Sequence, residues 1–193
     1  MVMSAFMLIF LSPVMLILSI AIVMDSKGGV FFRQERVTQY GRKFRIHKFR
    51  TMVADAEKKG IQVTLKNDTR VTKVGAKIRK YRLDEFPQLI DVFLGDMSFV
   101  GTRPETVKFV DKYESEFYAT LLLPAGITSE ASIRYKDEAE LLDAADDVDK
   151  VYVKEILPGK MKYNLESIRK FSFLGEIATM FRTVFAVLGK EYE

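Results

Sequence analysis

The chain has 193 residues, of which 48% are hydrophobic and 29% charged, and this size suits one packed domain with an attached segment. The formal net charge is +4, which favours anionic partners such as phosphorylated small molecules, anionic lipid or nucleic acid. Cysteine is absent and His47 is the one histidine, which excludes a disulfide framework, a thiolate metal site and a multi-histidine zinc site.

The first 24 residues carry no charged side chain and would form a helix about 36 Å long, enough to cross a hydrocarbon core of about 30 Å. They lack a basic leader and a convincing small-residue cleavage site, so a signal peptide is not expected. Near the centre, Pro13 would remove a helix hydrogen bond and kink the helix, while the hydroxyl of Ser12 could satisfy the freed carbonyl. Each arm would be roughly 17 Å long, about half the core. These residues alone favour a kinked spanning helix over a re-entrant hairpin that enters and leaves by one face.

A β-hairpin is predicted next, with strands at residues 30–32 and 43–49 and a connection at residues 38–41. Basic residues are concentrated in and around it, which after a membrane segment indicates the cytoplasmic side. They are Arg33, Arg36, Arg42, Lys43, Arg45, Lys48 and Arg50. Such a cluster can hold anionic lipid, a nucleotide diphosphate or, with its interleaved aromatic residues, nucleic acid. His47 alternates with apolar neighbours and is predicted to be structural.

The pair Asp84-Glu85 follows two predicted helical segments, residues 52–59, ended by Gly60, and residues 76–81. Neighbouring side chains on a helix point about 100° apart, so one carboxylate can face a phosphorus atom while the other holds a cation or a water. Arg79 and Arg82 precede the pair, and fixed cations lower the pKa of a carboxyl group and keep it ionised. The spacing alone favours a simpler interpretation, in which the acids are favourable charges at a helix N-terminus.

The rest of the chain is predicted to be largely helical. One apolar helical face follows the acidic pair and ends at Gly95. Residues 101–104 form a rigid turn that presents Arg103, and arginine suits bidentate phosphate contacts. Helices are then predicted at residues 107–123, at 152–170 with a break at Pro158-Gly159, and at 173–188. The apolar face of the last helix is expected to pack in the core, and an interfacial membrane helix is the alternative, although its polar face carries few charges. Residues 124–128 are predicted to be a loop, and the acidic segment 137–149 to be a solvated helix or loop.

Several motifs, in this order and spacing, resemble those of the bacterial sugar transferase family, the monotopic phosphoglycosyl transferases. They are Ser12-Pro13, Val30-Phe31-Phe32-Arg33-Gln34-Glu35-Arg36, Phe44-Arg45-Ile46-His47-Lys48-Phe49-Arg50-Thr51-Met52, Asp68-Thr69-Arg70-Val71-Thr72-Lys73-Val74-Gly75, Leu83-Asp84-Glu85-Phe86-Pro87-Gln88-Leu89, Gly95-Asp96-Met97-Ser98-Phe99-Val100-Gly101-Thr102-Arg103-Pro104 and Pro124-Ala125-Gly126-Ile127-Thr128. No single motif is decisive, but together they cover most of the chain.

The resemblance implies an α+β, mostly helical protein with two parts. Residues 1–24 would form a re-entrant membrane helix kinked at Ser12-Pro13, which reverses the preference for a spanning helix. Residues 25–193 would form a compact catalytic domain with a short β-hairpin and a C-terminal helix. The implied location is the cytoplasmic face of the bacterial inner membrane.

The reaction that the resemblance implies moves a phosphosugar from a UDP-sugar to a polyprenol (undecaprenyl) phosphate and releases UMP, as the initiating step of bacterial glycoconjugate or polysaccharide synthesis. Asp84 would be the covalent nucleophile, and Glu85 would help it to hold Mg²⁺. Phosphate and substrate contacts are expected from Arg79 and Arg103, and also from Lys48 and Arg50. Membrane lipids are expected partners, nucleic acid is not, and a homo-oligomer is compatible with the sequence.

The chain departs from the usual family pattern at three places. It begins almost within the apolar arm, without a basic amphipathic lead-in, which is expected of a truncated start or of weaker membrane attachment. It has Thr102 where the family usually has proline, and Ser129-Glu130-Ala131 where many members have a Gly-Leu-Ala-Gln-Val run. The sugar is therefore not specified by the sequence.

Two other interpretations of the sequence stay open at this point. One is a non-enzymatic, membrane-tethered basic module that binds anionic lipid or nucleic acid, which would leave Asp84-Glu85 and Arg103-Pro104 without a role. The other is a one-step transferase in which Asp84 acts as a general base.

Overall fold

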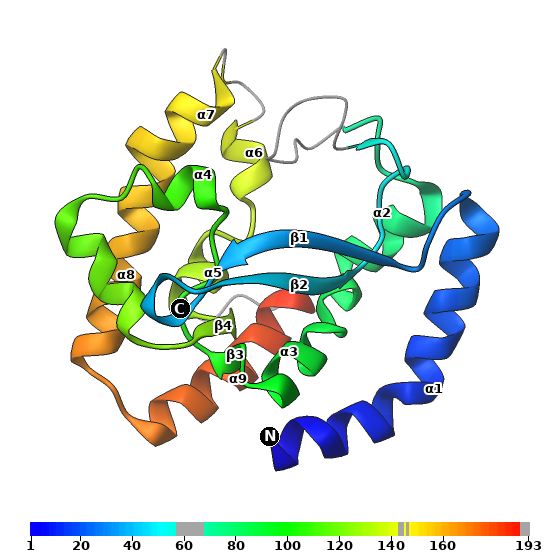
Figure 1. Cartoon of the computed structure of the whole chain (residues 1–193), viewed down its shortest axis with the longest axis horizontal. Coiled ribbons are helices and arrows are strands. Elements are labelled where there is room, and N and C mark those ends of the chain that lie inside the picture. The colour runs from blue at the N-terminus through cyan, green and yellow to red at the C-terminus, as the bar shows by residue number, and fades with distance from the viewer. Residues whose placement is uncertain (57–67, 143–144, 146, 190–193) are drawn as a thin grey trace. The chain divides into compact units, whose positions relative to one another are not determined.

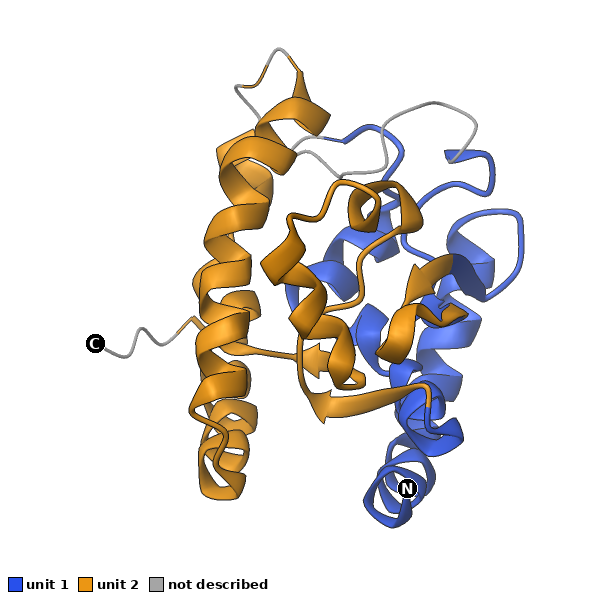
Figure 2. Ribbon diagram, turned by 60° about the vertical axis from the view of Figure 1, so that its left-hand side comes forward, with its two compact units in different colours: residues 1–34, 45–95 blue, residues 35–44, 96–193 orange. Residues whose placement is uncertain are grey.

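The computed structural model describes residues 1–56, 68–142, 145 and 147–189. They divide into two compact units (Figure 2). Unit 1 comprises Met1–Gln34 and Arg45–Gly95, and unit 2 comprises Glu35–Phe44 and Asp96–Glu193. The architecture is mostly helical with short sheets, which confirms the predicted α+β class.

Helix α1 (Val2–Asp25) runs without interruption through Pro13, and Figure 1 shows that it bends near its middle. The Oγ of Ser12 donates a hydrogen bond of 2.7 Å to the carbonyl of Ile9, the acceptor that the missing N–H of Pro13 leaves without its usual helical partner. The predicted role of Ser12 beside the proline is therefore confirmed. Within the described residues, α1 is the one helix long and apolar enough to cross a membrane, and most of its large side chains are exposed.

The predicted hairpin is confirmed: its second strand has the predicted bounds, and its first strand is longer than the sequence indicated. Strands β1 (Phe31–Val37) and β2 (Lys43–Phe49) form a two-stranded sheet, joined through the 3₁₀ turn η1 (Gln39–Gly41). Tyr40 adopts a left-handed conformation with φ 58°, and Gly41 follows with φ 74°. Two consecutive residues with positive φ let this connection reverse the chain direction.

The rest of unit 1 consists of helix α2 (Lys73–Lys80), the 3₁₀ turn η3 (Leu83–Glu85) and helix α3 (Gln88–Leu94). Thr72 caps α2 by accepting a hydrogen bond from the N–H of Gly75, and Gly95 ends α3 with φ 81°, as predicted. The core of this unit is formed by Ile22, Phe49 and Ile78, against which Met15 and Leu18 of α1 pack.

The predicted helix at residues 52–59 is wrong in its described part. Met52 instead pairs with Val71 in an isolated antiparallel bridge, and the N–H of Thr72 donates to the carbonyl of Thr51. A Cβ on Gly75 would lie 2.1 Å from that carbonyl oxygen, so the close approach of these backbones requires glycine. The remainder of the predicted helix, including Gly60, lies outside the described residues.

Unit 2 contains a parallel pair of strands, β3 (Met97–Val100) and β4 (Ala125–Thr128), in the register Met97 to Ala125. The prediction of a loop at residues 124–128 is therefore wrong. Gly126 lies so close to Gly101 that a Cβ would come within 2.2 Å of the Gly101 nitrogen. Four residues with two small side chains carry little strand signal, and the pairing with β3 supplies what the local sequence lacks.

Helices surround this pair within unit 2. Their bounds are α4 (Val107–Val110), η4 (Ser115–Leu122), α5 (Glu130–Arg134), α6 (Glu138–Leu142), α7 (Val148–Val151), the π-helical turn η5 (Tyr152–Ile156), α8 (Leu157–Arg169) and α9 (Phe173–Val187). The single helix predicted at 107–123 is two short helices, because Glu114 is extended between them. The predicted break at Pro158-Gly159 is also wrong, since α8 runs through both residues and follows directly on the π-helical turn η5. Leu142 and Val148 are buried within the acidic segment, and among its described charges Asp137, Glu140 and Asp147 are exposed, whereas Glu138 is half-buried against Lys160.

Helix α9 does not bury the apolar face that was expected to pack in the core. Phe173, Leu174, Phe181 and Leu188 are each more than 60% exposed, whereas the buried residue of the helix is Thr179. The polar side faces unit 2 instead: Thr183 shares a hydrogen bond with Thr128, and Arg182 pairs with Glu130. Core packing is therefore a wrong prediction for this helix.

Candidate active site

The acidic pair lies on the 3₁₀ turn η3 in unit 1, not in a regular α-helix. Arg82 begins the turn in a left-handed conformation with φ 51°, and its carbonyl accepts from the N–H of Glu85. Asp84 is half-buried and Glu85 is 9% exposed. The two neighbouring carboxylates therefore have different surroundings.

Lys48 and Arg79 belong to the same unit as the acidic pair. The Nζ of Lys48, on β2, lies 3.4 Å from Oε1 of Glu85. Arg79 is half-buried on the last turn of α2, and its carbonyl accepts a hydrogen bond from the N–H of Arg82. The hydrogen bond from Arg70 lowers the pKa of Asp68, and the charge of Arg79 adds a smaller effect of the same sign. Unit 1 thus supplies two carboxylates and two of the predicted phosphate-binding cations.

The guanidinium of Arg50 is buried and has extensive contacts with the chain that follows α1. It donates to the carbonyls of Ser26, Gly29 and Met52 and to the hydroxyl of Ser26. These contacts give Arg50 a structural role in joining α1 to the hairpin. A phosphate contact by Arg50 stays a prediction.

His47 has a structural environment, in agreement with the sequence analysis. Its Nδ1 lies 2.6 Å from Oδ1 of Asp91, and its backbone N–H donates to the other carboxylate oxygen. Complete burial raises the pKa of Asp91, although both contacts with His47 oppose that shift. The pair joins β2 to α3.

Arg103 belongs to unit 2, where the segment around it is fixed by backbone contacts. Its side chain is half-buried. Nη1 of Arg36 donates to the carbonyl of Pro104 at 3.1 Å, and the N–H of Val37 donates to the carbonyl of Glu105 at 3.0 Å. The carbonyl groups of the two residues directly after Arg103 are therefore both held by hydrogen bonds from β1.

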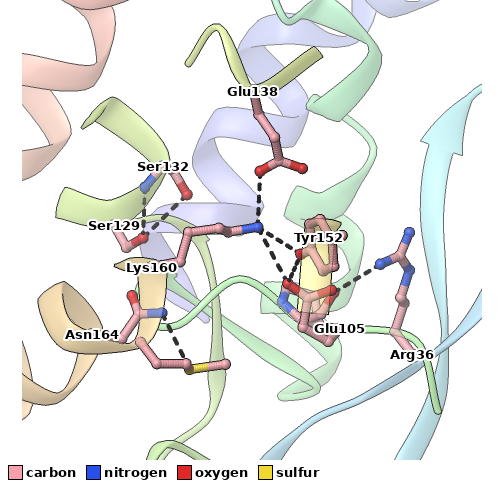
Figure 3. A network of polar contacts seen from close by, with 10 residues as sticks. Arg36, Glu105, Ser129, Ser132, Glu138, Tyr152, Lys160 and Asn164 are labelled. Atoms are coloured by element: carbon pink, nitrogen blue, oxygen red, sulfur yellow. Dashed lines mark hydrogen bonds and ion pairs between the residues drawn. The ribbon is translucent and has the colours of Figure 1, made fainter. Parts of the chain in front are cut away.

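A buried polar network, which the sequence analysis missed, surrounds Glu105 (Figure 3). Its Oε1 accepts from the hydroxyl of Tyr152 at 2.6 Å and from Nζ of Lys160 at 3.3 Å, and Lys160 also contacts Glu138 at 3.1 Å. Burial raises the pKa of Glu105, but the charges of Lys160 and Arg36 outweigh it and hold the pKa below its usual value. The sequence feature that could have drawn attention to Glu105 is its position immediately after Arg103-Pro104.

A cavity of about 610 Å³ lies within unit 2 between the β3–β4 pair and helices α5, α8 and α9. The guanidinium of Arg134 lies 4.9 Å from the ring centre of Tyr163 in its wall. Thr102, Ser129 and Glu130 also line it. Two of the segments in which the chain departs from the family pattern therefore meet at one cavity.

The oxygen donors of Asp84 and Glu85 fit the coordination habit of Mg²⁺. This ion commonly uses one or two carboxylates and takes its other ligands from water and substrate phosphates. Among residues 1–56, 68–142, 145 and 147–189, no group of three or more His, Cys, Asp or Glu side chains is placed to hold a metal ion. A magnesium site at Asp84 and Glu85 stays a prediction.

Comparison with known proteins identifies the family. The chain is 36% identical over 181 residues to a UDP-N-acetylgalactosamine-undecaprenyl-phosphate N-acetylgalactosaminephosphotransferase of Aeromonas hydrophila, with 92% of this chain and 40% of that protein covered. It is also 36% identical over 189 residues to a UDP-glucose:undecaprenyl-phosphate glucose-1-phosphate transferase of Klebsiella pneumoniae, with 95% and 38% covered. The chain thus spans about two fifths of the length of these relatives. Since the family's sequence pattern matches residues 1–190, the chain belongs to the bacterial sugar transferase family.

Proposed function

We propose that the protein transfers a phosphosugar from a UDP-sugar to a membrane polyprenol phosphate, such as undecaprenyl phosphate, and releases UMP. The observation that carries the proposal is the acidic pair on the turn η3, with Lys48 beside Glu85, in a chain of this family. Both relatives named above act on undecaprenyl phosphate by name, but with different sugars. The sugar therefore stays open.

In the first step, a carboxylate oxygen of Asp84 attacks the sugar-side phosphorus of the donor. A bond forms between that oxygen and phosphorus, the bond to the bridging oxygen breaks, and UMP leaves with the electron pair. In the second step, an oxygen of the polyprenol phosphate attacks the same phosphorus, which releases Asp84 and gives polyprenol-diphosphate-sugar. The half-buried position of Asp84 supports this assignment, because a nucleophile must be reached by its substrate.

The other residues would align the donor and neutralise its charge, which is most of what phosphoryl transfer requires. Glu85, buried beside Lys48, would hold Mg²⁺ together with Asp84. When bound, Mg²⁺ supplies charge neutralisation on the phosphate oxygens. Arg79 and Arg103 would contact the phosphates, with Lys48 and Arg50 as further contacts.

Helix α1 would attach the enzyme to the bacterial inner membrane as a re-entrant helix, with the remainder on the cytoplasmic face. The exposed apolar side chains of α1 and the satisfied Ile9 carbonyl at the bend support this arrangement. Reporter tags at Met1 and at Glu193 would both be cytoplasmic. Tags on opposite faces would show a spanning helix instead.

The decisive experiment is UMP release from a panel of UDP-sugars by the membrane-bound protein with magnesium and polyprenol phosphate. The Asp84→Asn variant should lose at least about a thousandfold in turnover, since it removes the nucleophile. Asp111→Asn, the same change at an exposed position in unit 2, should keep full turnover. Membrane binding with no UMP from any donor would contradict the proposal and favour a tethered binding module.

A second measurement separates the two transferase mechanisms. Without acceptor, the covalent mechanism predicts about one UMP released per protein and a phosphosugar bound to Asp84. Mass spectrometry of the quenched protein would detect it. Turnover with acceptor but no bound phosphosugar would favour the one-step mechanism with Asp84 as a general base.

A further inference from the structure

The cavity in unit 2 has the size and the walls of a small-molecule site. Its volume of about 610 Å³ falls within the usual range for ligand pockets of roughly 300–1,000 Å³. Strand β3 and helices α5, α8 and α9 supply much of its wall, together with the residues that flank β4, so the site is built largely on regular elements of one unit. Tyr163 adds an aromatic ring and Val100 an apolar side chain to these walls.

Asn164 is a buried side chain in this wall with unused hydrogen-bonding capacity. It lies on α8 and is 4% exposed, and its Oδ1 has no hydrogen-bond partner within the described residues. Its Nδ2 makes only a weak contact of 3.8 Å with the sulfur of Met161. A buried amide oxygen without a protein partner is costly, so a ligand that donates a hydrogen bond to it would be favoured at this wall.

Glu130 also lines the cavity and is held by two arginines. Its Oε1 accepts from Nε of Arg134 at 2.9 Å, and its Oε2 lies 2.9 Å from Nη1 of Arg182. The carboxylate is thereby fixed in position while a carboxylate's further lone pairs stay able to accept. Asn164 and Glu130 together make the wall rich in acceptors.

The wall selects a neutral ligand over an anionic one. Its three cations are Arg134, Lys170 and Arg182, and its three acids are Glu130, Glu166 and Glu176. Each of these cations contacts a carboxylate. Arg134 and Arg182 both contact Glu130. Lys170 lies 2.7 Å from Glu166. A phosphate would have to compete with those carboxylates, whereas a polyol would bring several hydroxyl donors to the acceptors.

The cavity also adjoins the segment that carries a predicted phosphate contact. Gly101 and Thr102 line it, and Arg103 follows directly in the chain. A ligand in the cavity would therefore lie beside the turn that leads into Arg103. A uracil ring, with one N–H donor, satisfies fewer of the acceptors than a pyranose with several hydroxyls.

We propose that this cavity receives the sugar ring of the donor, and that Asn164 and Glu130 discriminate between sugars by accepting hydrogen bonds from their hydroxyl or amide groups. The inference rests on the proposed function, because it takes a UDP-sugar as the ligand. It assigns the choice of sugar to unit 2, and the two residues act through binding and not through the reacting atoms.

The test is equilibrium binding of UDP-N-acetylgalactosamine, UDP-glucose and UDP to the full chain in nanodiscs, with Asp84→Asn present so that no donor is consumed. Adding Asn164→Leu should weaken the affinity for the better-bound UDP-sugar about tenfold, as expected for one lost buried hydrogen bond. The affinity for UDP should stay unchanged. Adding Glu130→Gln should alter the ratio of the two donor affinities. Lys162→Leu, at an exposed position of α8 outside the cavity wall, is the matched control and should change neither.

The outcomes separate this proposal from the reaction. Equal weakening of UDP and both UDP-sugars would overturn it and place the nucleotide in the cavity, and unchanged binding in both variants would overturn it outright. If Asn164→Leu fails to fold, Glu130→Gln alone decides, since an unaltered donor ratio contradicts the proposal. Sugar-selective binding that these variants remove, with no UMP released by the wild type, would overturn the reaction and support the sugar site.

Discussion

Each unit contains a lysine–glutamate pair next to a proposed site residue, and the two pairs differ in burial. In unit 1, Lys48 and Glu85 lie 3.4 Å apart with side chains that are 17% and 11% exposed. In unit 2, Lys160 and Glu105 lie 3.3 Å apart with exposures of 8% and 6%, and Tyr152 and Glu138 complete their contacts. The pair Lys48–Glu85 is accessible to solvent and is therefore suited to ligand binding. The pair Lys160–Glu105 is buried and is therefore suited to stabilising the backbone beside Arg103.

The largest expected effect is the loss of stability in Lys160→Met. Removing this lysine leaves the buried carboxylate of Glu105 without its main compensating charge, which should lower the free energy of unfolding by about 3–5 kcal/mol. Thermal and denaturant unfolding in detergent would measure it.

Lys48→Met is the matched control for that comparison. Because its pair is more exposed, the same substitution should lower the free energy of unfolding by only about 1 kcal/mol. Similar losses in both variants would show that the two pairs do not differ in the way their burial indicates.

Tyr152→Phe should have a smaller effect on the same network. It removes one hydroxyl that donates to the charged Glu105, a loss of about 1.5–3 kcal/mol in the free energy of unfolding. If the network positions Arg103, the KM for the UDP-sugar should also rise at a temperature where the variant is fully folded. An unchanged KM would limit the network to a structural role.

The sequence predicted those elements whose signals are local. The apolar helix with Ser12-Pro13, the hairpin strands and the glycine that ends α3 all depend on nearby residues, and all are confirmed. Strand β4 was missed because its four residues become a strand only by pairing with β3. The apolar face of α9 was misassigned because periodicity identifies a face but not what covers it.

The same limit applies to the candidate site. Adjacency in the chain indicated Asp84-Glu85 and Arg103, and the structure shows the turn and the backbone contacts that hold them. The partners of Glu105 could not be predicted, because Tyr152 and Lys160 lie far along the chain in a segment with no distinctive motif. The cavity likewise combines residues of four separate elements, β3, α5, α8 and α9, and of the segments between them.

The buried pair should also make stability depend on acidity. Because the pKa of Glu105 lies below its ordinary value of 4.5 in the folded protein, its contribution is complete above that value. That contribution is lost as the pH falls below 4.5 and through the folded-state pKa. Unfolding curves between neutral pH and pH 3 would measure the loss.

Glu105→Gln should flatten this dependence, but only in part, because Asp25 and Asp68 also have lowered pKa values in the folded protein. The matched variant Glu105→Leu should flatten it equally. An unaltered slope in both variants would contradict the assignment of acid sensitivity to this residue.

The smallest expected effect concerns the two non-glycine residues with positive φ in the described chain, one in each unit. Arg82 precedes the acidic pair with φ 51°, and Tyr40 lies in the hairpin connection with φ 58°. Glycine relieves about 1–2 kcal/mol of steric cost in this conformation but loses about 0.5–1 kcal/mol through the greater entropy of the unfolded chain. Arg82→Gly and Tyr40→Gly should therefore each change the free energy of unfolding by less than about 1 kcal/mol.

Their activities should differ, since Arg82→Gly also removes a guanidinium two residues before Asp84 and loosens the turn that carries it. UMP release should fall at least about tenfold in Arg82→Gly and stay unchanged in Tyr40→Gly, because an imprecisely held nucleophile loses the benefit of alignment. Arg82→Asn tolerates the same backbone conformation with less freedom than glycine, so it separates the two causes. If Arg82→Asn recovers activity, the turn conformation is what matters, and if it does not, the charge of Arg82 is part of the site.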